Sequence, residues 1–328
     1  MNSFSGNASP TGSMVAFDFH VSDEDAGVRF DHFLVQAVTD ISRSCLVQSI
    51  RMGLFLVDGH KKKSSYRLKS GERILGSIYE APPQVLVPQP VPFNILFEDE
   101  FLLVISKPPG IVVHPAAGNP DGTLVNGLLY HCKEIANVGD EVRPGIVHRL
   151  DKDTSGVMVV AKSSLCHRLL VDIFKEREVE KEYLALVHGH LRERQGRIIT
   201  SIDRHPVQRQ KMTVCEEHHG RYAASRWQVL EEYAEGCSLL RVGIETGRTH
   251  QIRVHMASLG HPVAGDNLYG RARNTRSYPR QMLHAHCLRF VHPVTGATMD
   301  YTAPAWSDFQ LIIDQLRDLE YEKLLNGP

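Results

Sequence analysis

The first residue whose position suggests chemistry is an aspartate in the string HRLDKDTSG, residues 148–156. Asp151 lies between Arg149 and Lys152, two cations that favour the ionised form of a nearby carboxyl group. The apolar run GVMVVAK follows, so we expect a loop that enters a strand. An ionised carboxylate at a strand edge can act as nucleophile or base. From this motif alone, a loop of ordinary salt bridges is the safer interpretation, and Asp153 is expected to be a structural partner.

A second group of polar side chains occurs in GRTHQIRVHMASLGHP, residues 247–262. It brings Arg248, His250, Arg253 and His255 close together along the chain. Two histidines suggest a metal site, but the nearby carboxylate and cysteine ligands of a typical site are missing. The arginines indicate a phosphate or carboxylate partner instead. We therefore predict that no metal is bound here.

Tyr183 stands in the string KEYLALVHG, which is typical of a β-strand. A tyrosine in a strand usually packs in the core or against a neighbouring strand. The residues alone therefore favour a packing role for Tyr183.

The elements that must position these residues fall into two regions. Residues 17–80 are predicted to form a small α+β module: a strand, a helix over 27–38, a second helix capped by Ser42 and ended by Gly53, and a strand with an Asp-Gly turn. Residues 1–16 are expected to be a flexible tail. Residues 81–92 contain five prolines, which indicates an extended linker.

Residues 93–328 contain many strand-like runs and few helices, with no strict alternation between the two. This order predicts an α+β domain with a mixed, mainly antiparallel sheet rather than a doubly wound parallel one. Apolar residues at helical spacing predict a terminal helix over 309–324.

Positive charge is concentrated in the first module. Between Arg43 and Arg73, eight lysines and arginines face two acids, Asp58 and Glu72. Such a local excess is a candidate phosphate-binding surface, and a solvated basic surface is an equally good interpretation of charge alone. The residues assigned to this surface are Arg43, Arg51, Lys61, Lys62 and Lys63.

Composition places the chain among ordinary globular proteins. It has 328 residues, of which 42% are hydrophobic and 23% charged, with a net charge of −1. No apolar run approaches a membrane span, and the N-terminus lacks the pattern of a secretory signal. The six cysteines never form C-x-x-C, which argues against a zinc ribbon or a disulfide framework. We expect a cytoplasmic protein with no membrane partner.

Taken together and in this order, the motifs resemble those of a known enzyme family. HRLDKDTSG, KEYLALV, GRTHQIRVHMASLGHPVAGDNLYG and RQMLHAHCLRFVHP resemble the RluA-type pseudouridine synthases. The segment FEDEFLLVISKPPGIVVHPAAGNPDGTLVNGLLYH resembles most the RluD-like members, which modify large-subunit ribosomal RNA. The basic module resembles the S-four RNA-binding domain. The resemblance spans residues 17 to about 310.

The resemblance implies a role for each matching residue. Asp151 matches the catalytic aspartate, and Arg253 matches the arginine that pairs with it. Arg149 matches the arginine that enters the RNA helix and helps to hold the target nucleotide out. Tyr183 matches the tyrosine that stacks on the flipped uracil, and Leu283 lies in a segment that matches an active-site wall.

The implied reaction is the isomerisation of specific uridines to pseudouridines in large-subunit ribosomal RNA or its assembly precursor. The uracil leaves the base stack, is detached and rejoins through carbon 5. Asp151 would attack the sugar or the base, or remove a ribose proton. Uracil is conserved in mass and no redox or energy input is needed, so no cofactor is implied.

Four other functions compete with this one, of which a general metal hydrolase fits least, because the ligand spacing is absent. Transfer RNA could be the substrate, or the chain could be an RNA-binding or ribosome-assembly protein without catalysis. A nucleoside hydrolase that uses Asp151 as nucleophile would release free uracil. The combination of Asp151, Tyr183 and Arg253 favours the synthase.

Overall fold

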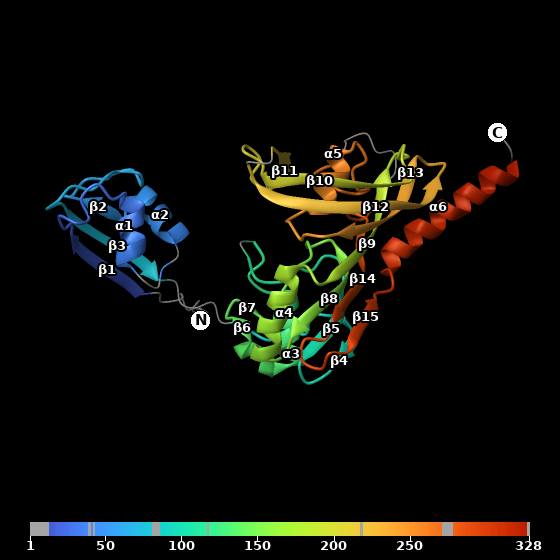
Figure 1. The fold of residues 1–328 in the computed structure, drawn as a ribbon, viewed down its shortest axis with the longest axis horizontal. Coiled ribbons are helices and arrows are strands. Elements are labelled where there is room, and N and C mark those ends of the chain that lie inside the picture. The colour runs from blue at the N-terminus through green and yellow to red at the C-terminus, as the bar shows by residue number, and fades with distance from the viewer. Residues whose placement is uncertain are drawn as a thin grey trace, which may run out of the picture. The chain divides into compact units, whose positions relative to one another are not determined.

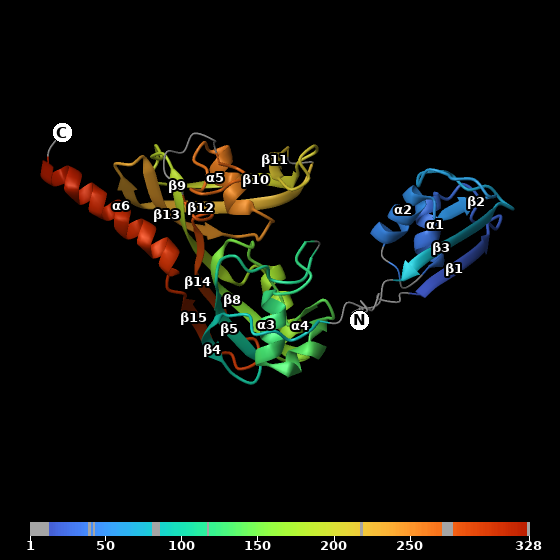
Figure 2. The same cartoon turned by 180° about the vertical axis from the view of Figure 1, so that it is seen from behind.

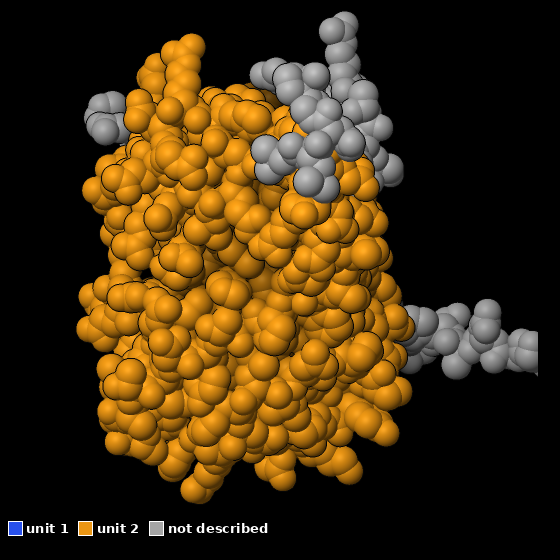
Figure 3. Space-filling view, turned by 90° about the vertical axis from the view of Figure 1, so that its right-hand side faces the viewer, with its two compact units in different colours: residues 1–85 blue, residues 86–328 orange. Residues whose placement is uncertain are grey.

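The structure, a computed structural model, describes residues 13–38, 41, 43–80, 86–116, 118–216, 219–270 and 278–326. The chain divides into two compact units, residues 1–85 and 86–328. The boundary falls within the proline-rich segment 81–92, of which residues 81–85 lie outside the described residues. Figure 3 shows one face of the larger unit.

The smaller unit combines two helices with a three-stranded antiparallel sheet (Figure 1). Its apolar residues form a core of their own, in which Phe30 and Leu34 of the first helix meet Leu46 and Ile50 of the second. This separate core accounts for a compact unit at this length. In chain order its elements are β1 (Ser13–His20), α1 (Phe30–Ala37), α2 (Arg43–Met52), β2 (Phe55–Val57) and β3 (Arg73–Glu80).

Local sequence signals explain the turns of this unit. Asp58 and Gly59 both have positive φ, 47° and 75°, as a two-residue hairpin turn requires, and Val57 pairs with His60. Gly53 follows α2 with φ 81°, so the predicted helix end is confirmed. Ser42, the predicted cap, lies outside the described residues.

One predicted boundary is wrong. The expected tail ran to residue 16, but β1 begins at Ser13 and pairs with β3 from the register Ser13↔Glu80 onward. Residues 13–16 therefore belong to the strand. The long partner β3 extends the ladder beyond the alternating FDFHVSD segment, and a pairing partner distant in sequence is not visible in local composition.

The larger unit is built on a ten-stranded sheet in the order β11-β10-β12-β13-β9-β14-β8-β5-β4, with β15 paired to β14 (Figures 1 and 2). In the described part of the chain, β14 and β8 form the parallel pair and the other named strand pairs are antiparallel. The predicted α+β domain with a mixed, mainly antiparallel sheet is confirmed. Its strands are β4 (Asn94–Glu98), β5 (Leu102–Lys107), β8 (Ser155–Ala161), β9 (Glu180–His188), β10 (Gln195–Arg204), β11 (Met212–Cys215), β12 (Arg221–Tyr233), β13 (Cys237–Ile244), β14 (Leu283–Val291) and β15 (Thr298–Thr302).

Helices cover the sheet, and β6 (Gly139–Asp140) and β7 (Arg143–Pro144) form a separate two-stranded hairpin. The terminal helix predicted over 309–324 is confirmed as α6. Its buried Phe309 and Leu316 join the core under Leu186 and Leu239. The helices are α3 (Leu124–His131), a 3-10 helix (Lys133–Asn137), α4 (Ser164–Glu176), α5 (Gln251–Ser258) and α6 (Ser307–Asn326).

The main core lies around the central strands. β5 and β8 are buried along their whole lengths, as strands covered on both faces should be. Gly156 has φ 115°, and a side chain there would collide with the backbone of Ala285. The glycine of HRLDKDTSG is therefore required for β8 to lie directly beside β14, which is the pairing that builds the site.

Candidate active site

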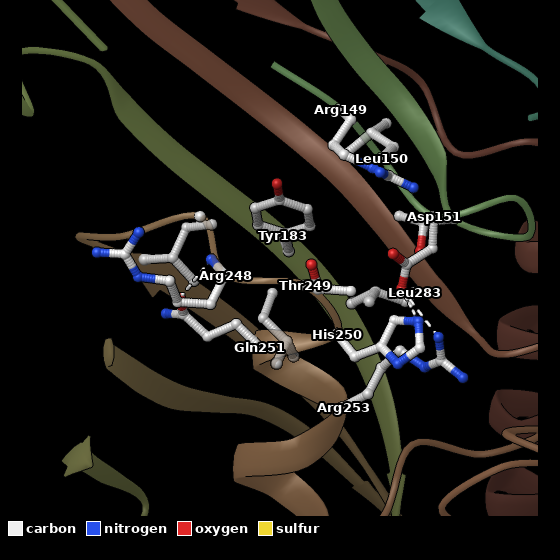
Figure 4. A pocket seen from close by; sticks show the side chains of 14 residues that line it. Arg149, Leu150, Asp151, Tyr183, Arg248, Thr249, His250, Gln251, Arg253 and Leu283 are labelled. Atoms are coloured by element: carbon white, nitrogen blue, oxygen red, sulfur yellow. Dashed lines mark hydrogen bonds and ion pairs between the residues drawn. The ribbon is translucent and has the colours of Figure 1, made fainter. Parts of the chain in front are cut away.

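Three neighbouring strands bring the predicted site residues together. The sheet order β9-β14-β8 places Tyr183 on β9 and Leu283 on β14 beside the loop that carries Asp151 into β8. The register Tyr183↔Ala285 puts Tyr183 and Leu283 on one face of the sheet. Both line a pocket with Arg149, Asp151 and Arg253 (Figure 4). Residues from 149 to 283 therefore meet at one point.

The loop that carries Asp151 is anchored at its start by His148. The backbone N–H of Val159 donates to Nε2 of His148 at 3.0 Å, and the His148 ring stacks on Phe174 at 4.7 Å. Burial, followed by the nearby charge of Lys181, lowers the pKa of His148 to about 3. A neutral ring is what an acceptor for a backbone N–H requires.

Two buried basic side chains, Lys107 and Arg280, donate hydrogen bonds to the same loop. Nζ of Lys107 donates to the carbonyl oxygens of Pro108, Ile111 and Lys152 at 2.8, 2.9 and 3.0 Å. Nη1 of Arg280 donates to the carbonyl oxygen of Asp153 at 2.9 Å. Burial, followed by the positive charge of Arg280, lowers the pKa of Lys107 to about 7. The loop backbone is thereby fixed at the two residues that directly follow Asp151.

Arg253 joins Asp151 to a second, fully buried carboxylate. Its Nη1 donates to Oδ2 of Asp151 at 2.9 Å, while Nε and Nη2 donate to the two oxygens of Asp266 at 2.6 and 3.0 Å. Asp266 also accepts the backbone N–H groups of Leu268 and Tyr269. Burial lowers the pKa of Arg253, but its hydrogen bonds and charge contacts with Asp266 and Asp151 outweigh it and raise the pKa above the usual range.

This chain of contacts fixes the direction of the Asp151 carboxylate. The Asp151 side chain keeps 19% of its surface exposed, whereas those of Arg253 and Asp266 are 8% and 0% exposed. Figure 4 shows Arg253 and His250 pointing toward the carboxylate of Asp151. A carboxylate oriented from one side and open to a pocket on the other can act as a nucleophile or as a base.

His250 stands at the entrance to α5 in a left-handed conformation, with φ 56°. Its Nε2 lies 4.0 Å from Oδ2 of Asp151, and its Nδ1 is 2.9 Å from the hydroxyl of Tyr269. The Tyr269 ring lies 5.1 Å from the guanidinium carbon of Arg253. A non-glycine residue in this conformation costs energy, so the surrounding contacts hold His250 against Asp151.

Tyr183 and Leu283 form the apolar wall of the pocket. Tyr183 is 8% exposed, and burial together with the negative charge of Asp151 raises the pKa of its hydroxyl above the usual range. Leu283 is 4% exposed. Arg149 is exposed at the pocket rim, and no carboxylate within the described part of the chain forms an ion pair with it.

The ion pair of Asp151 is the one with Arg253 that the family resemblance implied, not one with its neighbours in the sequence. The sequence suggested that Arg149 and Lys152 keep Asp151 ionised, but the ion pair in the described structure comes from Arg253, 102 residues away. Asp266 and Lys107 were not singled out from the sequence. Asp266 lies in the quoted string GDNLYG and Lys107 in ISKPPG, yet a single acid or lysine shows nothing of its burial until the fold is known.

The basic surface predicted for the smaller unit is only partly free. Nη2 of Arg43 lies 3.4 Å from Oδ2 of the buried Asp31. Nζ of Lys62 lies 4.9 Å from the centre of the Tyr66 ring. The remaining three residues are exposed to solvent: Arg51, Lys61 and Lys63.

Within the described ranges, no group of three or more His, Cys, Asp or Glu side chains could hold a metal ion. His255, one of the histidines of the second motif, is fully buried between Ser225 and Thr200, at 2.9 and 3.0 Å. Both of its ring nitrogens are engaged by these hydroxyl groups, so His255 has a structural role. Among the same described residues, no helix is long and apolar enough to cross a membrane.

Comparison with known proteins gives one consistent answer. Residues 101–258 match the family model described as RNA pseudouridylate synthase. An uncharacterized RNA pseudouridine synthase of Aquifex aeolicus is 43% identical over 92% of this chain and 97% of its own length. Ribosomal large subunit pseudouridine synthase D of Xanthomonas campestris is also 43% identical, over 91% of this chain and 92% of its own.

A solved structure, human RNA pseudouridylate synthase domain containing 1, has a TM-score of 0.54 with 29% identity and covers 70% of this chain and 96% of its own. The range matched by the family model includes the HRLDKDTSG loop, Tyr183 and α5, which contribute most of the pocket lining. The chain therefore belongs to the RNA pseudouridine synthase family, whose members are isomerases.

Proposed function

We propose that this protein converts specific uridines of large-subunit ribosomal RNA, or of its assembly precursor, to pseudouridine. The observation that carries the proposal is the Asp151 carboxylate, held by Arg253 at 2.9 Å and facing a pocket walled by Tyr183 and Leu283. The choice of RNA is supported by the relative from Xanthomonas campestris, which is named for the large ribosomal subunit.

The proposed roles follow from the position of each side chain. The target uridine must leave the base stack before its glycosidic bond can be reached. Arg149, exposed at the rim, fills the vacated space, and Tyr183 offers an aromatic wall for the uracil. Asp151 drives cleavage of the glycosidic bond, and the uracil rejoins through carbon 5. Arg253 acts by orienting Asp151, and no cofactor takes part.

The smaller unit is proposed to be an S-four-type module that docks the same RNA. Support comes from its two helices packed on a small sheet and from the exposed cations Arg51, Lys61 and Lys63. These cations match the phosphates of a structured RNA. We propose that the protein works in the cytoplasm.

Mapping of pseudouridines across total RNA tests this function. RNA from cells with the gene, without it, and with it restored should differ at one or more positions of large-subunit ribosomal RNA. If the maps differed only in transfer RNA, transfer RNA would be the substrate instead. Release of free uracil by the purified protein would indicate a hydrolase, and unchanged maps together with RNA binding would indicate a protein without catalytic activity.

A further inference from the structure

A strongly basic groove adjoins the active-site pocket, and apart from Arg149 its cations have no part in the roles proposed so far. The two hollows share Arg149, Tyr183 and Arg248 in their walls. Beyond the pocket the groove continues past Arg177 at the end of α4 and Arg221 at the start of β12. Lysines 175 and 181 also line it.

Three further arginines of this groove resemble Arg149 in having no acidic partner among the described residues. Among the described residues, no carboxylate forms an ion pair with Arg177, Arg221 or Arg248. The acid in the groove wall, Glu245, is bound to Arg197 at 2.7 Å. Burial, followed by the charges of Arg221 and Arg177, lowers the pKa of Arg248, so the three cations act on one another unfavourably.

Two of these side chains are nevertheless held in place at one tyrosine, Tyr222. Nε of Arg248 donates to the backbone carbonyl oxygen of Tyr222 at 2.9 Å. The guanidinium of Arg177 lies over the Tyr222 ring, 5.3 Å from its centre. Arg221, at the start of β12, lines the same groove, and its charge acts on Arg248. Three elements distant in sequence therefore bring like charges together, an arrangement that an anion would stabilise.

We propose that Arg177, Arg221 and Arg248 form a phosphate subsite that holds the RNA backbone beside the nucleotide in the pocket. The inference rests on the proposed RNA substrate and adds the location of its backbone. Guanidinium groups bind phosphate oxygens through paired N–H donors, and a polynucleotide presents phosphates at regular intervals along such a groove. Because Arg248 lines both hollows, the phosphates concerned are those adjacent to the flipped uridine.

The test compares Arg177→Gln/Arg221→Gln with Arg168→Gln. Arg168 is an exposed arginine on α4 that does not line the groove, so it controls for the loss of charge. The probe is a transcript of large-subunit ribosomal RNA that contains a uridine converted by the wild-type protein. We expect the double variant to reduce the salt slope of binding by about 2, one for each lost contact, and to raise Kd at least tenfold at 150 mM salt.

A second arm locates the contact. Methylphosphonate linkages, which carry no charge, replace the phosphates flanking the target uridine. They should weaken binding of the wild-type protein and of Arg168→Gln, but add little to the defect of the double variant. Thermal melting of each variant verifies that it is folded.

The subsite is rejected if the folded double variant binds with the wild-type salt slope, or if the uncharged linkages weaken both proteins equally. These outcomes differ from failure of the proposed function. In that case the wild-type protein itself would form no pseudouridine in ribosomal RNA, and the salt slopes of the variants would still be measurable.

Discussion

At the scale of single residues, Arg253 is the side chain that binds the Asp151 carboxylate in the pocket. Its guanidinium divides its donors between an exposed carboxylate and a buried one, with Asp266 bound through two nitrogens and Asp151 through the third. This geometry needs a planar, branched cation. A lysine has the charge but presents a single nitrogen, which cannot reproduce the pattern.

Arg253→Lys is therefore expected to slow catalysis rather than weaken RNA binding. A displaced carboxylate costs about 10²-fold in rate when the reacting atoms shift by about an ångström. Single-turnover rates across an RNA titration measure this, with exposed Arg241→Lys on β13 as the matched control. If the lysine variant reached the wild-type rate at saturating RNA, Arg253 would be a phosphate contact instead.

The sequence predicted which residues form the site better than it predicted the contacts between them. The resemblance identified Asp151, Tyr183 and Arg253, and the structure places all three around one pocket. The contacts of Lys107 and Asp266 were not predictable, because each depends on which parts of the chain the fold places next to the side chain. Lys107 binds the carbonyl of Lys152, 45 residues away, and nothing local signals that contact.

At the scale of elements, Asp266 links α5 to the loop that follows it. Its buried carboxylate accepts from Arg253 on α5 and from the N–H groups of Leu268 and Tyr269. Burial raises the pKa of this carboxyl group, but the hydrogen bonds and charge of Arg253 and these N–H groups outweigh that effect and lower it overall. The ionised form is thus part of the folded structure.

Asp266→Asn should lower the free energy of unfolding by about 3–5 kcal/mol at neutral pH, because it leaves a buried arginine with one partner fewer. A depressed carboxyl pKa contributes stability above the unfolded value of about 3.9 and loses it as pH falls toward the folded value. The difference in free energy of unfolding between wild type and variant should therefore narrow below about pH 4.

Denaturant unfolding at pH 7 and at successively lower pH measures this gap. Asp172→Asn, an exposed acid on α4, serves as control and should change stability by less than about 1 kcal/mol. A gap for Asp266→Asn that stayed constant from pH 7 to pH 3 would show that its charge does not contribute.

Element types were more predictable than their pairing. The terminal helix and the strand carrying Tyr183 followed from local patterns, and both were found. The first strand began four residues earlier than expected, because its partner β3 lies some 60 positions along the chain in the register Ser13↔Glu80. The β9-β14-β8 order, which creates the pocket, likewise depends on pairings between distant segments.

At the scale of the whole molecule, positive charge is divided between two units of a chain whose net charge is −1. The smaller unit has its own core and exposes Arg51, Lys61 and Lys63. The larger unit contains the pocket and the groove. On this account the smaller unit contributes affinity, whereas chemistry belongs to the larger one.

Lys61→Ala/Lys63→Ala should accordingly reduce the salt slope of RNA binding by about 2 and leave the single-turnover rate at saturation near the wild-type value. Lys62 is left in place because it lies over Tyr66. Lys133→Ala/Lys323→Ala removes two exposed lysines of the larger unit and is the matched control. If both pairs of substitutions changed the salt slope equally, the effect would come from overall charge and not from a docking surface on the smaller unit.

The most direct test of the account is the single-turnover rate of pseudouridine formation by Asp151→Asn on a ribosomal RNA transcript that the wild-type protein converts. Asparagine retains the shape and one acceptor for Arg253 but loses the charge. Asp153→Asn is the control, since it is the backbone carbonyl of Asp153 that Arg280 binds. We predict that Asp151→Asn lowers the rate by about 10³-fold or more with RNA affinity retained, and that Asp153→Asn stays close to wild type. Turnover by Asp151→Asn near the wild-type rate would contradict the account.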